Sequence, residues 1–395
     1  MRRFGIRHLE TIEDAVQEAL LKALRVWGYH GWPENPSGWI YTASKNGFMD
    51  SLRRSAWLKD HGDRVSADME EFLGKSPTWE EPEIRGFLQD SELRLLFQCC
   101  HPALSLPTRV AFTLRTLGGF SDAEIARAFL SEPEAVQRRL QRARKTLQEF
   151  GASAADLESA MDERMESALH SLYLMFNEGY TLREDGDSGL RRELCEEALR
   201  LAALLADGSS PDPNAAGALC AVFHFQLSRF AARLDADGGV VLLEFQDRNL
   251  WDAAHIQKGL ARMKQSAHGE NLTRYHLEAG IASCHALALD FAGTDWNLIL
   301  EHYDLLLRLN FSPVVALNRV LALSMVAGPE SALSEMDKPW SRTLSDYYPY
   351  WAALGSLHHR AGNGEKSGTA YSQALTLAKN PAVRKFLQEK ISENF

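Results

Sequence analysis

Apolar residues recur at helical spacing along nearly all of this 395-residue chain, and no convincing alternating run marks a strand. An apolar face that repeats every three to four residues fits a helix packed on a core, whereas strand side chains alternate between two faces. The sequence therefore predicts an all-α fold. At this length the chain is too long for one ordinary core, so two to three domains are expected.

Two amphipathic helices are predicted before residue 60. The first spans about 12–27 and is ended by Gly28 and the Gly31-Trp-Pro33 turn. Its apolar stripe consists of Ile12, Ala15, Val16, Ala19, Leu20, Ala23, Leu24 and Trp27. The second spans about 37–54. The following segment, 60–83, is acidic, rich in Gly and Pro and weakly periodic, which is typical of a flexible linker.

Two capping boxes lie ten residues apart in the next part of the chain. Ser121 precedes Glu124, and Ser131 precedes Glu134. In such a box the serine oxygen accepts from the glutamate amide while the glutamate side chain reaches back to the serine amide. The two starts predict a helix of about eight residues, a turn near Leu130 and a helix of about fifteen. That spacing is typical of a helix-turn-helix.

The second of these helices concentrates positive charge in an acidic protein, whose formal net charge is -10. Its apolar positions follow the spacing i, i+4, i+7, i+11 and consist of Val136, Leu140, Ala143 and Leu147. Arg138, Arg142 and Lys145 repeat that spacing two positions on, about 200° around the helix, so they are expected to face away from the core. Arg139 and Arg144 flank them.

A solvated face is the ordinary interpretation of a basic helix, but two observations favour DNA. Few acids lie at i±4, so no salt-bridge lattice within the helix accounts for the arginines. The helix is also the second of a helix-turn-helix, the one whose exposed face enters the major groove. Arginine can bond guanine O6 and N7 as well as phosphate, so the stripe is expected to supply both specificity and affinity.

Charge is divided unevenly along the sequence. Residues 1–59 have nine Lys/Arg and six Asp/Glu, residues 60–92 have three and ten, and residues 93–149 have nine and five. The net charges are therefore +3, -7 and +4, and the remaining 246 residues carry the whole -10. Only the two basic N-terminal modules are candidates for contact with a polyanion.

The C-terminal part shows a weak internal period of 34 residues. Tyr303 and Tyr371 lie 68 residues apart, and so do Pro313 and Pro381; Gly328 and Gly362 lie 34 apart. In the last unit the small and aromatic residues follow the packing pattern of a tetratricopeptide repeat, except that serine stands where alanine is usual: Trp351, Leu354, Gly355, Gly362, Ser367, Tyr371 and Ala374. Divergent repeats of this type are expected from about residue 280.

Several motifs, taken in order, resemble bacterial extracytoplasmic-function sigma factors of the sigma-70 family. The stretches 13–27 and 39–54 resemble region 2, and Leu106-Pro107, Phe120-Ser-Asp-Ala-Glu-Ile-Ala126 and the arginine helix resemble region 4. Phe176-Asn-Glu-Gly-Tyr180, the segment 232–239 and the repeats are similar to the subgroup with a tetratricopeptide-like extension. The resemblance covers nearly the whole chain.

The resemblance implies promoter recognition as a subunit of RNA polymerase. It assigns the -35 element to Gln137, Arg138, Arg139, Gln141, Arg142, Arg144 and Lys145. It assigns the -10 element to Asn46, Asp50, Arg53 and Arg54. It assigns docking on the β' coiled coil of core polymerase to Asp14, Gln17 and Glu18. The β flap is a further expected partner surface on the polymerase. The 31–37 loop would capture a flipped base, and Trp32 and Trp39 would stack on melted strand, although Trp39 equally suits a core role.

The domain organisation that follows has four parts. Residues 1–59 form region 2, 60–92 an acidic linker, 93–150 region 4 with its helix-turn-helix, and 160–395 a C-terminal helical domain. The family pattern has a further helix before the one at Ile12, so the expectation is either that region 2 is shortened at its N-terminus or that the start site is misassigned. The C-terminal domain is expected to hold or present the sigma domains, or to offer its repeat surface to a protein partner.

No catalytic constellation, cofactor or metal site is expected. Adjacent residues on a helix point about 100° apart, which argues against metal binding by Cys99-Cys100-His101 or His358-His359. Asp235-Ala-Asp237-Gly-Gly239 lacks the ligand register of a calcium loop and is expected to form a turn. The alternatives to a sigma factor are a DNA-binding regulator, such as a repressor, and a helical scaffold that acts without polymerase.

The sequence favours a cytoplasmic location. Five cysteines follow no metal-ligand or disulfide spacing, which suits a reducing compartment. The basic N-terminal residues lack the apolar segment of a secretory signal behind them. Apolar runs stay well short of the roughly 18 residues that span a bilayer, so no membrane segment is expected.

Overall fold

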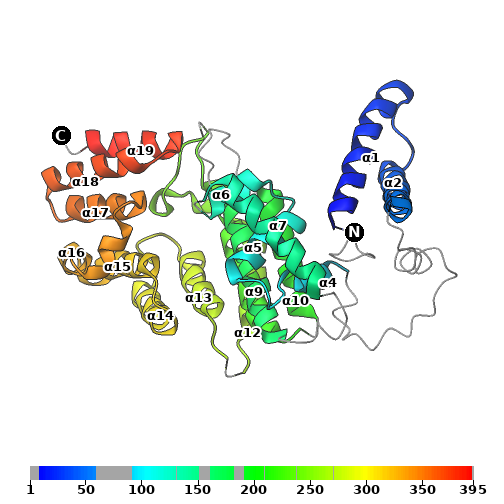
Figure 1. The fold of residues 1–395 in the computed structure, drawn as a ribbon. Coiled ribbons are helices and arrows are strands. Elements are labelled where there is room, and N and C mark those ends of the chain that lie inside the picture. Colours follow the sequence, from blue (N-terminus) through cyan, green and yellow to red (C-terminus); the bar gives the residue numbers. More distant parts are fainter. Residues whose placement is uncertain are drawn as a thin grey trace. The chain divides into compact units, whose positions relative to one another are not determined.

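The computed structural model describes residues 9–58, 91–129, 131–150, 161–181, 191–208, 210–236, 238–269 and 271–393 (Figure 1). The chain divides into two compact units, Met1–Ala168 and Leu169–Phe395. The predicted acidic linker lies almost wholly outside the described residues. All regular structure in the described ranges is helical, and an isolated bridge between Leu234 and Val240 is their only strand-like pairing. The predicted all-α class is confirmed.

The first unit begins with two helices, α1 (Leu9–His30) and α2 (Pro36–Leu58), which pack on each other. Their shared core consists of Ile12, Ala15, Phe48 and Met49, with Val16 beside it. α1 continues through Gly28, so the predicted stop at that glycine is wrong. It ends at Gly31, whose positive φ of 78° suits glycine and whose amide donates to the Trp27 carbonyl at 3.0 Å.

The buried face of α1 is narrower than the predicted stripe. Ala15, Ala19 and Ala23 are buried, but Leu20 is 44% exposed and Leu24 is 75% exposed. The placement of these two leucines in the core stripe is therefore wrong. α2 is the helix that packs most extensively on α1, and a single main neighbour covers a narrower strip than the broad apolar face that the sequence offers.

The second part of the first unit is built from four helices: α4 (Ser91–Cys99), α5 (Leu106–Thr116), α6 (Asp122–Ala128) and α7 (Pro133–Phe150). The predicted capping box at the start of α6 is present. The Ser121 amide donates to Glu124 Oε2 at 2.8 Å, and the Glu124 amide donates to Ser121 Oγ at 3.2 Å. α5, α6 and α7 pack on one another around fully buried side chains that include Phe112, Phe120 and Ile125.

The second capping box is not formed. Ser131 Oγ is buried without a hydrogen-bond partner, and the first amides of α7 turn back to the Glu132 carbonyl. The helix therefore begins one residue later than predicted, with Pro133 at its first position. Proline suits that place because it has no amide to leave unsatisfied and its fixed φ is already helical. The predicted turn residue Leu130 lies outside the described residues.

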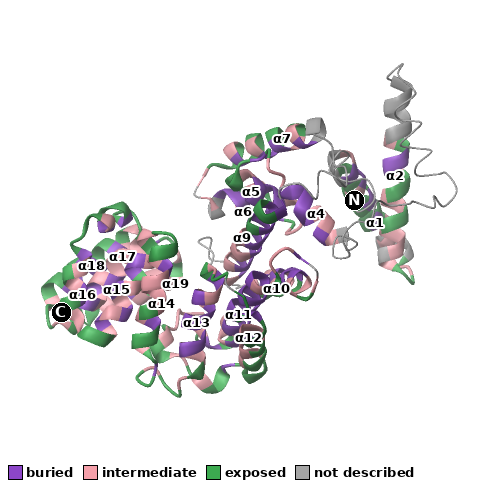
Figure 2. Ribbon diagram, turned by 90° about the horizontal axis from the view of Figure 1, so that it is seen from below, coloured by how far each residue is buried: buried purple, intermediate pink, exposed green. Residues whose placement is uncertain are grey.

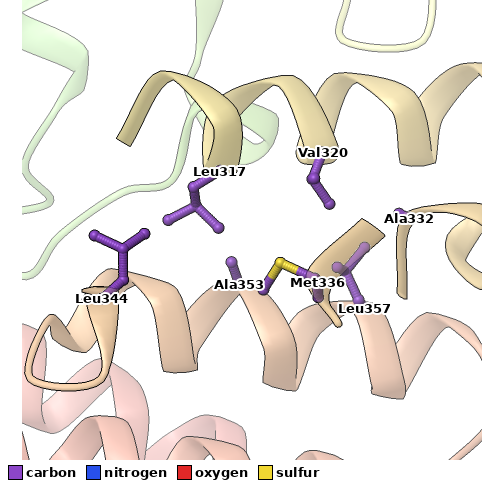
Figure 3. Close-up of a cluster of buried hydrophobic side chains, with 7 residues drawn as sticks. All are labelled: Leu317, Val320, Ala332, Met336, Leu344, Ala353 and Leu357. Carbon is purple, nitrogen blue, oxygen red and sulfur yellow. The ribbon is translucent and has the colours of Figure 1, made fainter. Parts of the chain in front are cut away.

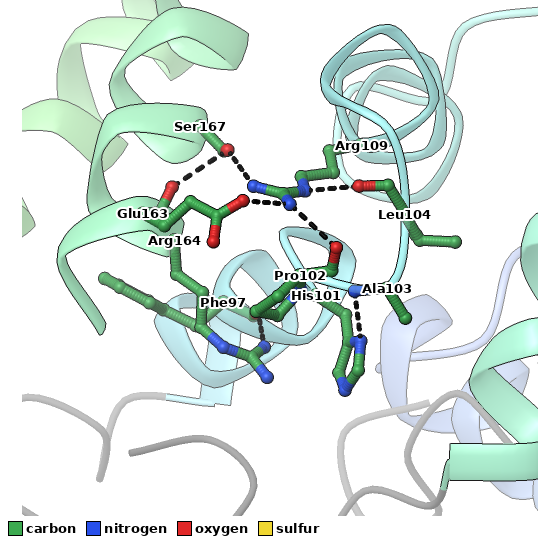
Figure 4. A network of polar contacts seen from close by, with 9 residues as sticks. All are labelled: Phe97, His101, Pro102, Ala103, Leu104, Arg109, Glu163, Arg164 and Ser167. Atoms are coloured by element: carbon green, nitrogen blue, oxygen red, sulfur yellow. Dashed lines mark hydrogen bonds and ion pairs between the residues drawn. The ribbon is translucent and has the colours of Figure 1, made fainter. Parts of the chain in front are cut away.

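A long-range polar network closes the first unit (Figure 4). Arg109 of α5 is only 4% exposed. Its Nε donates to the Leu104 carbonyl at 2.8 Å, one Nη to the Pro102 carbonyl at 3.0 Å and the other to Ser167 Oγ at 3.0 Å; it also pairs with the Glu163 carboxylate. Ser167 and Glu163 lie on α9 (Met161–Tyr180), which thereby holds the loop after α4.

The second unit starts with α10 (Arg192–Asp207), α11 (Pro213–Ser228), α12 (Ala253–Ser266) and α13 (Arg274–Leu287). Nearly every residue of α11 is buried, since α10, α12 and α13 all pack against it (Figure 2). A helix that is apolar all round is the expected centre of such a bundle. Three short 3-10 turns join α11 to α12: η3 (Phe230–Ala232), η4 (Leu243–Phe245) and η5 (Arg248–Leu250).

The rest of the second unit stacks helices in sequence, each on the next: α14 (Trp296–Leu309), α15 (Pro313–Ala327), α16 (Pro329–Met336), η6 (Pro339–Leu344), α17 (Tyr348–Arg360), α18 (Gly364–Leu377) and α19 (Pro381–Ser392). A buried cluster from α15, α16, η6 and α17 fills one layer, and Figure 3 shows Leu317, Met336 and Leu357 within it. The region is repeat-like, as the sequence predicted.

The predicted period recurs in the helix bounds. α14 and α18 begin 68 residues apart and end 68 residues apart. Gly328 and Gly362 both lie at the turn between paired helices, with positive φ of 85° and 75°. Tyr371 packs so closely on Gly355 that a Cβ there would meet its ring at 2.9 Å. Ser367, the departure from the expected alanine, is fully buried and donates to the Gly355 carbonyl at 2.8 Å.

Two smaller predictions concern the second unit and the membrane. Asp235 and Gly239 close a turn in which the Asp235 amide donates to the Gly239 carbonyl at 3.0 Å and Asp235 Oδ1 accepts from the Gly239 amide at 2.6 Å. The predicted turn is confirmed, with Gly238 at φ 77°. In the part of the chain that the structure describes, no helix combines the length and apolarity needed to cross a bilayer.

Candidate nucleic-acid interface

The inner face of α7 anchors the helix to the first unit. Val136, Leu140 and Ala143 are at most 2% exposed, and Leu147 is 5% exposed. They pack on α5 and α6, the helices that precede the turn. The predicted apolar stripe is confirmed, and its burial fixes which side chains of α7 remain available at the surface.

The outer face of α7 is basic and exposed (Figure 2). Arg138, Arg142 and Lys145 are all exposed, as are Gln137 and Gln141 between them. Neither the two arginines nor the lysine forms an ion pair with any residue in the described ranges. Arg142 Nε donates to the Arg138 carbonyl at 3.3 Å, so the side chain lies back along the helix in this state.

Arg139 and Arg144 are half-buried on the flanks of that face. The Arg139 guanidinium lies over the ring of Phe129, 5.7 Å from its centroid. Phe129 belongs to the turn between the two helices, and its amide donates to the Ile125 carbonyl at 3.0 Å. Contact of a cation with an aromatic face fixes the orientation of Arg139 at modest energetic gain. The two flanking arginines thus border the exposed stripe rather than lie in its centre.

The candidate -10 residues fall on α2. Asn46 and Asp50 are exposed, whereas Phe48 and Met49 between them are buried against α1. The pair therefore lies on the side of α2 that faces away from its helical partner. Arg53 and Arg54 also lie within α2, but their side chains are outside the described part of the structure.

An aromatic cluster lies where α1 ends and α2 begins. Trp27 contacts Trp32, with ring centroids 5.1 Å apart, and meets Trp39 edge-on at 5.6 Å. Trp32 is 78% exposed, while Trp27 and Trp39 are half-buried. Trp39 packs on the edge of Trp27, which is compatible with the core role that the sequence also offered for it. Trp32 keeps one face available in the loop, supported from behind by Trp27.

The candidate polymerase-binding residues share one exposed face of α1 with apolar neighbours. Asp14, Gln17 and Glu18 are all exposed, and they are followed one and two turns later by Leu21, which is 56% exposed, and Leu24. Leu24 was predicted as part of the apolar stripe, whereas Leu21 was not singled out from the sequence. The signal was available: an apolar stripe that is too wide for a helix with one partner leaves leucines outside the core.

The described residues contain no cluster of three or more His, Cys, Asp or Glu that could hold a metal ion. Cys99 and Cys100 are completely buried, and burial raises the pKa of the Cys99 thiol. A buried thiol of this kind is inert as a nucleophile. His358 is half-buried and His359 exposed on α17.

Family models match three parts of the chain. Sigma-70 region 2 matches residues 1–58, and Sigma-70, region 4 matches residues 94–147. A family of unknown function, DUF6596, matches residues 164–267. The last match covers α9 to α12 rather than the repeats that follow, so the tetratricopeptide-like character of the C-terminal part rests on the sequence period and on the packing described above.

Two relatives are similar to this chain over different shares of its length. An uncharacterized protein of Rhizobium meliloti is 36% identical over 392 residues, which cover 98% of this chain and 90% of the relative. The ECF RNA polymerase sigma factor SigG of Mycobacterium tuberculosis is 30% identical over 188 residues, which cover 44% of this chain and 51% of SigG. No solved structure matches the chain. The chain, which carries sigma-70 region 2 and region 4 domains and a DUF6596 domain, therefore belongs to the same protein family as its Rhizobium meliloti relative.

Proposed function

We propose that this protein is an extracytoplasmic-function sigma factor: a non-enzymatic initiation factor that binds core RNA polymerase and directs it to promoters. The observation that carries the proposal is the outer face of α7, where Arg138, Arg142 and Lys145 are exposed and unpaired within the described residues. A recognition helix needs such a face, because guanine edges and phosphates are bound by arginine. The sigma-70 matches supply the context of a promoter rather than of another DNA site.

Under this proposal the residues divide by target. Arg138, Gln141 and Arg142 read the -35 bases, while Gln137, Arg139, Arg144 and Lys145 hold phosphates. Asn46, Asp50, Arg53 and Arg54 meet the -10 element on α2, and Trp32 stacks on a base that has left the duplex. The support from geometry is that the described side chains among them are exposed or half-buried rather than fully buried.

Polymerase binding is assigned to the α1 face of Asp14, Gln17 and Glu18, extended by Leu21 and Leu24. A mixed face of carboxylates and exposed leucines suits a protein partner better than DNA, since phosphates repel the carboxylates and interfaces gain from buried apolar area. The partner surface is the β' coiled coil; region 4 is assigned to the β flap. The cytoplasm is the compartment in which core polymerase is met.

The C-terminal unit is assigned a regulatory role, either by binding a protein partner on its stacked helices or by presenting the sigma domains. The domain limits proposed from the sequence are 1–59, 60–92, 93–150 and 160–395, with repeats from about 280. Because Arg109 is held by Glu163 and Ser167, a truncation that tests this role is best made after residue 168 rather than at 160.

Run-off transcription tests the proposal. Purified core polymerase is combined with the full chain on genomic fragments, and then with the Arg138→Ala/Arg142→Ala variant and with Leu21→Ser/Leu24→Ser. We expect discrete transcripts with the full chain. The arginine variant should lose promoter binding, and the leucine variant should no longer co-purify with core polymerase. If the chain bound promoters specifically without core polymerase and gave no transcripts, an independent regulator would be favoured instead. If it neither bound promoters nor gave transcripts, a scaffold would be favoured.

A further inference from the structure

The C-terminal unit contains a group of arginines that the sigma function leaves unexplained. Arg229 follows α11, Arg233 follows η3 and Arg248 opens η5. Two of them meet on one indole: the Arg248 guanidinium lies 4.5 Å from the Trp251 ring centroid and that of Arg229 lies 5.8 Å away. Arg233 lies close enough to Arg229 for their charges to interact: burial lowers the pKa of Arg233, and the positive charge of Arg229 acts in the same direction.

Their partners are neutral. Arg229 donates to Tyr180 Oη at 3.2 Å and to Gln226 Oε1 at 2.5 Å. Arg233 donates to the Tyr180 carbonyl, and Arg248 to the carbonyls of His285 at 2.6 Å and Ala288 at 2.8 Å. Among the described residues, none of the three guanidiniums forms an ion pair with a carboxylate.

The helix ends offset only part of this charge. Tyr180 ends α9 and His285 lies in the last turn of α13, so Arg233 and Arg248 each meet a helix C-terminus. Each such end carries roughly half a negative charge. Three guanidiniums against two helix ends leave a surplus of positive charge, in a unit whose sequence is otherwise acidic. The negative charge of Asp290, which acts to raise the pKa of Arg248 against the effect of burial, offsets part of that surplus, so that about one positive charge remains. Burial, together with the charges of Arg229 and Arg248, lowers the pKa of His285 to about 4.

Buried donors without partners lie in the same place. Three nitrogen atoms are buried without a hydrogen-bond partner: one Nη of Arg248, Nε1 of Trp251 and Nδ1 of His285. Trp251 is only 7% exposed. A buried donor left unpaired costs roughly 1–3 kcal/mol, and an uncompensated charge costs more. Acceptor atoms that bring negative charge would satisfy both deficits together.

We propose that Arg229 and Arg248, which meet on Trp251, together with Arg233, which meets Arg229 at Tyr180, form a binding site for a small anion of the phosphate class in the C-terminal unit. A phosphate group is negatively charged at neutral pH and offers three acceptor oxygens, which would offset the surplus positive charge and accept from the unpaired donors. The site is independent of the proposed sigma function, because it lies wholly within residues 169–395 and shares no residue with the α1, α2 or α7 faces.

Equilibrium dialysis of the full chain against radiolabelled inorganic phosphate tests the site at constant ionic strength. We expect saturable binding of about one phosphate per chain. Arg229→Gln should weaken it about tenfold, since a hydrogen bond to a charged group is lost. Arg229 is the residue to change because Arg233 and Arg248 also hold helix ends. Arg319→Gln is the matched control: Arg319 lies in the same unit but pairs with Asp304. Far-UV circular dichroism confirms that each variant is folded.

A second arm separates a ligand from the chain's own acids. The sequence between Thr181 and Arg191 contains Glu184, Asp185 and Asp187. If these carboxylates were the anion, the wild-type chain would bind no phosphate and the variant Glu184→Gln/Asp185→Asn/Asp187→Asn would bind it. That result overturns the ligand site, as does equal phosphate binding by the wild type and Arg229→Gln. Saturable binding that is lost in Arg229→Gln and kept in Arg319→Gln supports it.

Discussion

Arginines on α7 and arginines on α10 of the C-terminal unit differ in whether a carboxylate pairs with them. In α10, Arg192 pairs with Glu196 one turn away, and Arg200 pairs with Glu197. On α7, Arg142 has only basic residues or threonine at those spacings, and Arg138 has a single acid there, Glu134 at i-4. Neither arginine forms an ion pair within the described residues. The contrast shows that positive charge stays available on α7 because acids at i±3 and i±4 are few and do not pair with these arginines.

A third situation lies between these extremes in the first unit. Arg109 is buried and bonded to two carbonyls, a hydroxyl and a carboxylate, so its charge is used to hold structure. Arginines of one protein thus serve as a structural tie, as neutralised surface charge or as free charge. Substitutions at these positions test the comparison, because each class predicts a different size and kind of effect.

The largest expected effect is on the structural tie. Arg109→Ala removes a buried side chain and leaves the carbonyls of Pro102 and Leu104 without their donor, which should lower the free energy of unfolding by about 3 kcal/mol. Urea denaturation followed by circular dichroism measures it. Glu163→Gln is the control, since that carboxylate is half exposed and its loss should cost under about 1 kcal/mol. Equal losses for the two variants would mean that Arg109 acts only as an ion-pair partner.

Loss of free charge comes next, and it should appear in binding rather than in folding. Arg142→Ala should weaken promoter binding by about 1–3 kcal/mol while the unfolding midpoint stays unchanged. Fluorescence anisotropy with a promoter duplex measures the affinity in the presence of core polymerase. Arg200→Ala, which removes a paired arginine of α10, should leave it unaltered. Promoter affinity that survives Arg142→Ala would remove α7 from the interface.

Titration separates the units further, because depressed histidine pKa values occur in the second. Burial, reinforced by His255, lowers the pKa of His224 from 6.5 to about 4. Between these pH values the unfolded chain binds more protons than the folded one, so stability falls as pH drops from about 6.5 towards 4 and is fully present above that window. Tm should fall by roughly a few degrees. His224→Asn should flatten the profile, and an unchanged slope would exclude His224 as its source.

The smallest effect is expected at a neutralised surface arginine. Arg192 and Glu196 are each about half exposed, so their ion pair is screened by water. Arg192→Ala should change the free energy of unfolding by about 0.5 kcal/mol or less. The measurement is the urea midpoint at low and at 1 M salt. A loss above about 1.5 kcal/mol would show that the contact of Arg192 with the Phe230 ring, 5.7 Å away, matters more than its ion pair.

Local patterns of sequence predicted most of what proved correct. The stripe of Val136, Leu140, Ala143 and Leu147, the box of Ser121 with Glu124 and the turn glycines Gly328 and Gly362 all depend on neighbours within a few residues or on a regular period. The capping box predicted at Ser131 is not formed, because α7 begins with Pro133 at its first position instead. The serine and the proline are both local signals for a helix start. The outcome was decided by which of the two residues fits the first helical position.

Long-range features could not be predicted from the sequence. Arg109 and Ser167 are 58 residues apart, and nothing around either residue marks the other as its partner. Leu24 looked like a core residue because an apolar side chain at helical spacing says nothing about how many helices will cover it. Nothing in the sequence around Arg229 or Arg248 marks Trp251 as the ring that both guanidiniums contact. DNA reading, polymerase docking and the domain limits remain proposals.

The constant spacing of 68 residues between α14 and α18 has a consequence for how such a chain can change in length. Because corresponding helices recur after 68 residues, adding or removing a whole period keeps every remaining residue in phase with its packing partner. Removing three residues would instead rotate the next helix by about 300° and turn Tyr371 away from Gly355. Related proteins should therefore differ in the length of this region by whole helix pairs, so that the size of the C-terminal unit varies in steps.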